Sequence, residues 1–121
     1  MISYVTIGTN DLERAAKFYD AVLAPLGCKR GPETERYKSW LGPTRGPMLM
    51  VMKPFDGKPA TVGNGVMVAL GAESPEVVDA VYNAAIEAGG ACEGAPGERS
   101  PGLYVGYFRD LDGNKLDAIC M

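Results

Sequence analysis

The feature that most constrains this chain is an internal repeat, in which the second half follows the same order of strand, helix and extended segments as the first. One constant spacing separates Tyr4 from Met67 along the first strand and helix of each half. Further along, a short insertion changes the spacing and pairs Trp40 with Tyr107. Each half offers one apolar face that has to be buried against another element. The sequence therefore predicts two βαβββ modules in one α+β domain.

Local signals define the first module. Residues 2–8 alternate as a strand does, and residues 10–13 give an N-cap with a carboxylate three positions on, which opens a helix. Apolar residues keep helical spacing until Gly27 ends the helix. Shorter extended segments separated by Gly and Pro are predicted at residues 28–31, 36–41 and 47–53.

The second module repeats these signals. A strand is predicted at residues 65–71, and Ser74 caps a helix that has Pro75 at its first position. Extended segments are predicted near Ala91, at 103–109 and at 115–120, and residues 94–102 are expected to form a mobile loop over the ligand site. We expect one domain over residues 1–121, with modules at 1–54 and 63–121 joined by a linker at 55–62.

Composition limits the partners and the compartment. A chain of 121 residues that is 46% hydrophobic can bury one sizeable core. The net charge of −3 offers no clustered cations for nucleic acid, and no run of apolar residues is long enough for a membrane span. The N-terminal residues lack the pattern of a signal peptide, and Cys28, Cys92 and Cys120 form an odd set without metal-type spacing. We therefore expect a cytoplasmic protein with free thiols.

The absence of histidine excludes more chemistry than any other compositional fact. Mechanisms that use an imidazole base are ruled out, and so is every metal site that needs a histidine nitrogen. Carboxylate, phenol, thiol and amine chemistry remain.

The alternation of side chains along each strand predicts two faces. The aliphatic face, which includes Val5, Leu49, Val51 and Leu116, should lie under the helices. The opposite face would gather Tyr4, Met67, Asp117 and a series of other large side chains, namely Met48, Met50, Met52, Ile119 and Met121.

Five segments carry a resemblance to a known family: residues 2–8, 10–15, 18–19, 63–65 and 109–116. They resemble the glyoxalase, bleomycin-resistance and extradiol-dioxygenase superfamily, also called vicinal oxygen chelate. The most specific segment is the Arg-Asp-x-Asp-Gly-Asn turn that begins at Arg109 and is followed by a strand with an acidic residue. The resemblance implies paired βαβββ modules that form a curved, cup-shaped mixed sheet with helices on its outer face, commonly in a homodimer.

Metal-binding members of that superfamily place His or Glu at four cup-facing positions, which correspond here to Tyr4, Met50, Met67 and Asp117. Only Asp117 is a plausible ligand for a hard cation, and it is one methylene shorter than the usual glutamate. Thioethers are soft, neutral donors that do not replace imidazole or carboxylate. We therefore expect no metal site and no metal cofactor.

The methionines favour a binding function. Met side chains are flexible and polarizable, so they can conform to an irregular apolar or aromatic molecule. The expected ligand-binding residues are Met48, Met50, Met52, Met67, Ile119 and Met121. The alternative is that these side chains simply fill the cup as core.

Asp117 also allows two interpretations. In an apolar cup its pKa would rise, and it could act as a general acid or base with the Tyr4 hydroxyl as hydrogen-bond partner. It could instead be an exposed or hydroxyl-paired carboxylate with no catalytic role. Three classes of function therefore stay open. The first is a metal-free binding protein for a small apolar or aromatic molecule, and the second is a lyase, isomerase or dioxygenase of the superfamily that uses Asp117 and Tyr4 or an atypical metal. The third is a non-catalytic protein with a filled cup.

Overall fold

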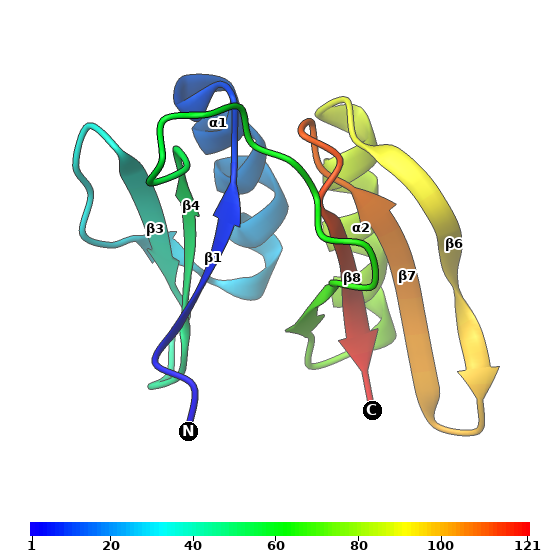
Figure 1. Ribbon diagram of the computed structural model, residues 1–121. Helices are drawn as coiled ribbons and strands as arrows, with labels where there is room; N and C mark the ends of the chain where they lie inside the picture. The colour runs from blue at the N-terminus through cyan, green and yellow to red at the C-terminus, as the bar shows by residue number, and fades with distance from the viewer.

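The computed structural model describes residues 1–121 and contains the same sequence of elements twice (Figure 1). The first half comprises β1 (Tyr4–Gly8), α1 (Leu12–Leu23), the 3₁₀ turn η1 (Ala24–Leu26), β2 (Lys29–Arg30), β3 (Tyr37–Leu41) and β4 (Met48–Met52). The second half comprises β5 (Val68–Gly71), α2 (Pro75–Glu87), β6 (Ala91–Ser100), β7 (Leu103–Arg109) and β8 (Lys115–Cys120).

The strands form two four-stranded sheets with the same topology. Their orders are β1-β4-β3-β2 and β5-β8-β7-β6, and only the β1–β4 and β5–β8 pairs are parallel. A parallel pair needs a crossover connection, and α1 or α2 lies in each one. The predicted pair of βαβββ modules is confirmed.

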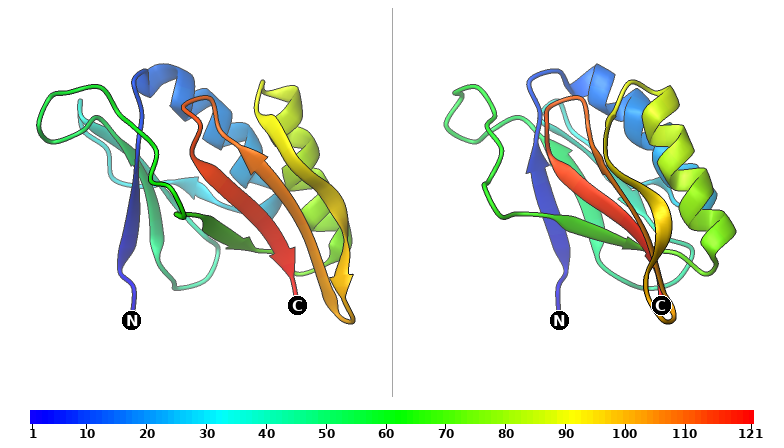
Figure 2. Two further views of the ribbon diagram at one scale, coloured as in Figure 1. Left: turned by 45° about the vertical axis from the view of Figure 1, so that its right-hand side comes forward. Right: turned by 90° about the vertical axis from the view of Figure 1, so that its right-hand side faces the viewer.

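Both helices lie on one side of the two sheets, as Figure 2 shows. The predicted aliphatic face lies under them, since Leu49, Val51, Leu116 and Ala118 belong to one buried cluster with residues of α1 and α2. We call the opposite face of the two sheets the cup face. Neither helix has the length and hydropathy that crossing a bilayer requires.

Helix ends follow the sequence signals with one change. Ser74 caps α2 by accepting a hydrogen bond from the Val77 amide. The cap of α1 is Asp11, which accepts from the Arg14 amide, while the Asn10 side chain bonds instead to the backbone of Ala60 in the linker. The polar cluster before α1 therefore both starts the helix and fixes the linker.

The loop expected at residues 94–102 is mostly strand. β6 extends to Ser100 and pairs with β7 through a ladder that is interrupted by register shifts. Gly94 and Pro96 lie at these irregularities, which are the places where a strand tolerates such residues. Residues 94–100 therefore belong to a bulged β-hairpin, and the predicted mobile loop is wrong.

In β3 and β7, the structural correspondence between the two halves differs by one residue from the correspondence that the sequence repeat predicted. Trp40 pairs with Leu49 and Phe108 pairs with Leu116, and all four lie in the core. Phe108 is therefore the structural equivalent of Trp40. The expected partner, Tyr107, points to the cup face because neighbouring residues on a strand point to opposite sides.

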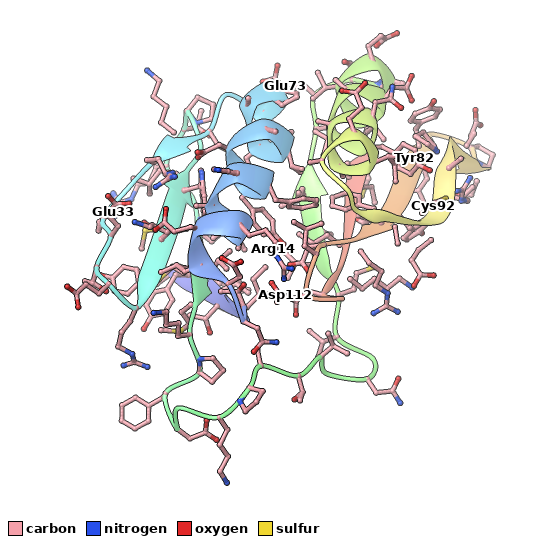
Figure 3. The ribbon with its side chains drawn as sticks, turned by 90° about the horizontal axis from the view of Figure 1, so that it is seen from above. Arg14, Glu33, Glu73, Tyr82, Cys92 and Asp112 are labelled. Carbon is pink, nitrogen blue, oxygen red and sulfur yellow. The ribbon has the colours of Figure 1, made fainter.

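The two modules meet through their helices and through the β7–β8 turn, while no strand of one sheet pairs with a strand of the other. Within the turn, Asp112 Oδ2 accepts a 2.6 Å hydrogen bond from the Thr9 hydroxyl, and Oδ1 accepts from the Asn10 amide at 2.9 Å. The Arg14 guanidinium lies 3.4 Å from the same carboxylate, in the gap between the helices (Figure 3). Asp112 therefore fastens the second module to the start of α1.

Candidate functional site

The first sheet contributes a methionine-rich half to the cup face. Register pairs Tyr4 with Met48 and Thr6 with Met50, so these side chains share one face of β1 and β4. Met50 is 8% exposed, whereas Tyr4 is 56% exposed. Ser39, opposite Met50 on β3, is fully buried and donates its hydroxyl to the Pro32 carbonyl. This half of the cup is therefore lined mainly by thioethers and by the phenols of Tyr4 and of Tyr37, which pairs with Met52.

The second sheet places Asp117 where the first sheet has Met50. Asp117 lies between Ala69 on β5 and Tyr107 on β7. Ala69 corresponds to Thr6 by the same spacing that relates Met67 to Tyr4, so Asp117 is the equivalent of Met50. Met67 lies immediately before β5 and is 42% exposed. Each module therefore carries one pair of the four predicted positions, Tyr4 and Met50 in the first and Met67 and Asp117 in the second.

Asp117 is buried without a partner. It is 2% exposed, its Oδ1 has no hydrogen bond, and no side chain donates to the carboxylate. Tyr4 does not donate to it, so the predicted Tyr4–Asp117 hydrogen bond is not formed. Burial raises the pKa of the Asp117 carboxyl, and the nearby Lys115 ammonium partly opposes this increase. The cup face of the second module therefore carries one carboxylate whose charge is poorly compensated.

Ile119 and Met121 lie at the other end of β8. Met121 follows the strand and is 91% exposed. Both residues line a separate hollow of about 630 Å³ next to η1 and the start of α2. They are therefore separated along the strand from Lys115, which begins β8 and lies beside the segment that contains Met67.

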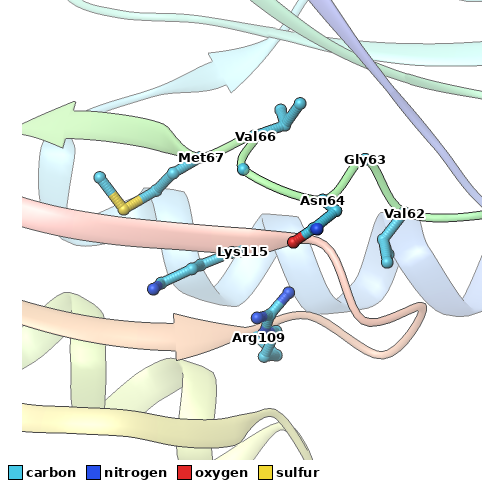
Figure 4. Close-up of a pocket in the computed structure, with 8 residues that line it drawn as sticks. Val62, Gly63, Asn64, Val66, Met67, Arg109 and Lys115 are labelled. Atoms are coloured by element: carbon cyan, nitrogen blue, oxygen red, sulfur yellow. The ribbon is translucent and has the colours of Figure 1, made fainter.

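A pocket of about 540 Å³ opens beside Met67 (Figure 4). The segment before β5 forms one wall, and Arg109 and Lys115 form the other. This segment lies close to the β7–β8 turn, since a Cβ atom on Gly113 would meet Val62 Cγ1 at 3.4 Å. The lining residues are Val62, Gly63, Asn64, Gly65, Val66, Met67, Arg109 and Lys115.

The two cations of this pocket were not predicted as site residues. Arg109 is held in place because its Nε donates to Glu93 and its Nη1 donates to the Gly113 carbonyl at 3.0 Å. The Lys115 ammonium lies 5.6 Å from the centre of the Tyr107 ring and forms no ion pair. Strand alternation could have identified Lys115, since it lies two residues before Asp117 and shares its face.

The four equivalent positions do not offer the donors that a hard divalent cation requires. They comprise one carboxylate, one phenol and two thioethers, and Asp117 is the only anion among them. Nowhere in the chain do three Cys, Asp or Glu side chains gather around a common point. The chemistry that this donor set does offer is apolar contact, one acid or base, and two nearby cations.

The family model and the solved structures that match this chain indicate the same family. The model of the Glyoxalase/Bleomycin resistance protein/Dioxygenase superfamily matches residues 1–118. No curated protein matches the chain.

Solved structures share the fold over the whole length. A glyoxalase/bleomycin resistance protein from Albidiferax ferrireducens T118 is 42% identical with a TM-score of 0.91, and the match covers 98% of this chain and 97% of that chain. A hypothetical protein from S. aureus is 27% identical with a TM-score of 0.74, covering 100% and 97%. A lactoylglutathione lyase from Agrobacterium tumefaciens is 19% identical with a TM-score of 0.72, covering 98% and 92%, and shares the fold alone.

Proposed function

Because this chain belongs to the glyoxalase/bleomycin resistance protein/dioxygenase superfamily, we propose that its cup binds a small apolar or aromatic molecule without a metal ion. The observation that carries the proposal is the pair of thioethers, Met50 and Met67, at two of the four positions that hold metal ligands in metal-dependent relatives. A thioether contributes apolar, polarizable contact area and almost no affinity for a hard cation.

The pocket beside Met67 supports an open cup. Its volume of about 540 Å³ lies within the range of about 300–1,000 Å³ that is usual for small-molecule sites. Val62, Val66 and Met67 give it an apolar wall. These features favour binding over the alternative of a cup filled by its own side chains.

The test is a thermal-shift titration with 2-naphthamide, a neutral aromatic probe, in the presence of a strong chelator. A ligand that binds only the folded state raises the melting temperature, and the chelator should not reduce the rise. Met67→Ser should weaken binding, whereas Met121→Ser should not, because Met121 lies at the other end of β8. No stabilisation by the probe would contradict the proposal.

Asp117 supports a second candidate function. A buried, unpartnered carboxylate with a raised pKa is a typical general acid or base. In this candidate the chain is a metal-independent lyase or isomerase in which Asp117 moves a proton and Tyr4 contacts the substrate at the open edge. Asp117→Asn would then abolish turnover of any substrate found by screening and leave the fold intact, whereas normal turnover by that variant would exclude the role.

We also propose a cytoplasmic homodimer. β1 and β5 each pair on one side only, and the exposed large apolar residues include Ile2 and Val66 next to these open edges. A second copy would cover them. Sedimentation velocity should show a dimer that Ile2→Glu weakens, and a monomeric wild-type protein would contradict this. The three cysteines form no disulfide, which suits a reducing compartment.

A further inference from the structure

We propose that the pocket beside Met67 is a carboxylate subsite, so that the ligand of the cup is an apolar or aromatic acid. This inference rests on the proposed binding function and specifies the class of ligand. It follows from the arrangement of Arg109, Lys115 and Asn64 at one end of the cup face.

Arg109 and Lys115 are direct register partners on β7 and β8. Like charges directly opposite one another on a sheet destabilise it. Both residues line the pocket, and strand alternation places them on the cup face. An anion bound between them would relieve the repulsion.

The protein's own carboxylates form a direct ion pair with only one of these cations. Glu93 accepts from Arg109 Nε, and this contact lowers the pKa of Glu93, which keeps it ionised. Lys115 has no carboxylate within ion-pair distance. Its charge acts on the carboxyl groups of Glu93 and Asp117, but it donates a hydrogen bond to neither. The ammonium of Lys115 is therefore available to a ligand.

The geometry of the donors suits a carboxylate. Two nitrogens of Arg109 are already engaged by Glu93 and Gly113, which fixes the guanidinium and leaves Nη2 without a bond in the protein. Figure 4 shows the Asn64 side chain ending near Arg109, with its amide oxygen on the side of Arg109, and the Asn64 side chain makes no hydrogen bond within the chain. Arg109 and Lys115 can donate to the two oxygens of a carboxylate, and rotation of the Asn64 amide would bring its NH2 group in as a third donor.

The same pocket also offers apolar side chains to the uncharged body of the ligand. Val62, Val66 and Met67 line the same pocket as Arg109 and Lys115, and the Met67 side chain lies on the side of Lys115 (Figure 4). A molecule with an anionic end and an apolar body would satisfy both walls at once. A purely apolar molecule would bury the unpaired ammonium and amide without a partner, which is costly.

The experiment compares 2-naphthoate with 2-naphthamide, which have the same aromatic body, by isothermal titration calorimetry. The wild-type protein should bind the acid about tenfold more tightly than the amide, which is the effect of one charge-assisted hydrogen bond. Lys115→Gln should abolish this preference, because it removes the charge that distinguishes the acid from the amide. Lys58→Gln, in the exposed linker, is the matched control and should preserve the preference.

The outcomes separate the two proposals. Binding of the amide with no preference for the acid, or a preference that persists in Lys115→Gln, overturns the carboxylate subsite and leaves the proposed function standing. Binding of neither probe contradicts both. If Lys115→Gln unfolds, Asn64→Ala on the exposed segment provides the same comparison, with a loss of acid preference expected and an unchanged preference counting against the subsite.

Discussion

The Tyr19 hydroxyl donates a 2.6 Å hydrogen bond to Asp110 Oδ2 across 91 positions of the chain, inside the junction of the two modules. Asp110 also accepts from the amides of Asp112 and Asn114, and the Asn114 side chain donates to the Gly8 carbonyl. Burial, and then the charge of Asp110, raise the pKa of Tyr19 well above its ordinary value. The Arg-Asp-x-Asp-Gly-Asn turn therefore has a structural role: together with the helix contacts, its hydrogen bonds hold the two modules together.

Removal of the Tyr19 hydroxyl should destabilise the protein. Tyr19→Phe deletes a buried hydrogen bond to a carboxylate, and such bonds contribute about 1.5–3 kcal/mol. Urea unfolding should show a loss of this size. Tyr4→Phe is the control, because the exposed Tyr4 hydroxyl makes no hydrogen bond. Equal stability of the two variants would show that the junction does not depend on this contact.

Gly90 should not tolerate a side chain. A Cβ atom there would lie 2.7 Å from the Arg109 carbonyl oxygen and 2.8 Å from the Ala85 carbonyl oxygen, and neither backbone can move without disturbing β7 or α2. We expect Gly90→Ala to cost about 1–3 kcal/mol of unfolding free energy. Gly46→Ala is the matched control, since a Cβ atom at Gly46 would meet nothing within 4 Å. A neutral Gly90→Ala would mean that the helix and strand are less tightly packed than described.

The stability of the protein should depend on pH through Asp117. Its folded-state pKa is raised by burial, so the folded state holds the proton more firmly than the unfolded state does. The stabilisation is complete at low pH and is lost as pH rises through the interval between the ordinary pKa, about 3.9, and the raised value. Asp117→Asn removes this titration.

The measurement for Asp117 is the difference in unfolding free energy between Asp117→Asn and wild type across a pH series. The difference should shift in favour of the variant as pH rises from about 4 toward neutrality. Asp56→Asn, at an exposed position in the linker, is the matched control. A difference that is independent of pH would contradict the raised pKa.

Much of the fold is predictable because its signals are local. The N-cap of α2, the helical spacing of apolar residues and the glycines that end the helices follow from short-range chemistry. The one-residue error at Trp40 and Tyr107 arose because aromatic residues occur on both faces of the third strand, and only pairing with Leu49 or Asp117 distinguishes the faces. That pairing is a tertiary property.

The cup face was only partly predictable. Strand alternation correctly assigned Met50 and Asp117 to one face, since it depends on sequence parity alone. Arg109 and Lys115 line the pocket only because residues 62–67 pass close to the β7–β8 turn. No local sequence pattern encodes that path. The bulged β6 was missed for a similar reason, because Gly94 and Pro96 are typical of loops unless a partner strand holds them.

The most direct test of the account is the affinity for 2-naphthamide of protein that has been stripped of metal, with elemental analysis of the same sample. We predict that the stripped protein binds the probe and that addition of Mn²⁺ or Zn²⁺ leaves the dissociation constant unchanged, because Tyr4, Met50 and Met67 offer a hard cation no suitable donor. Binding that appears only after a stoichiometric metal is restored would contradict the account.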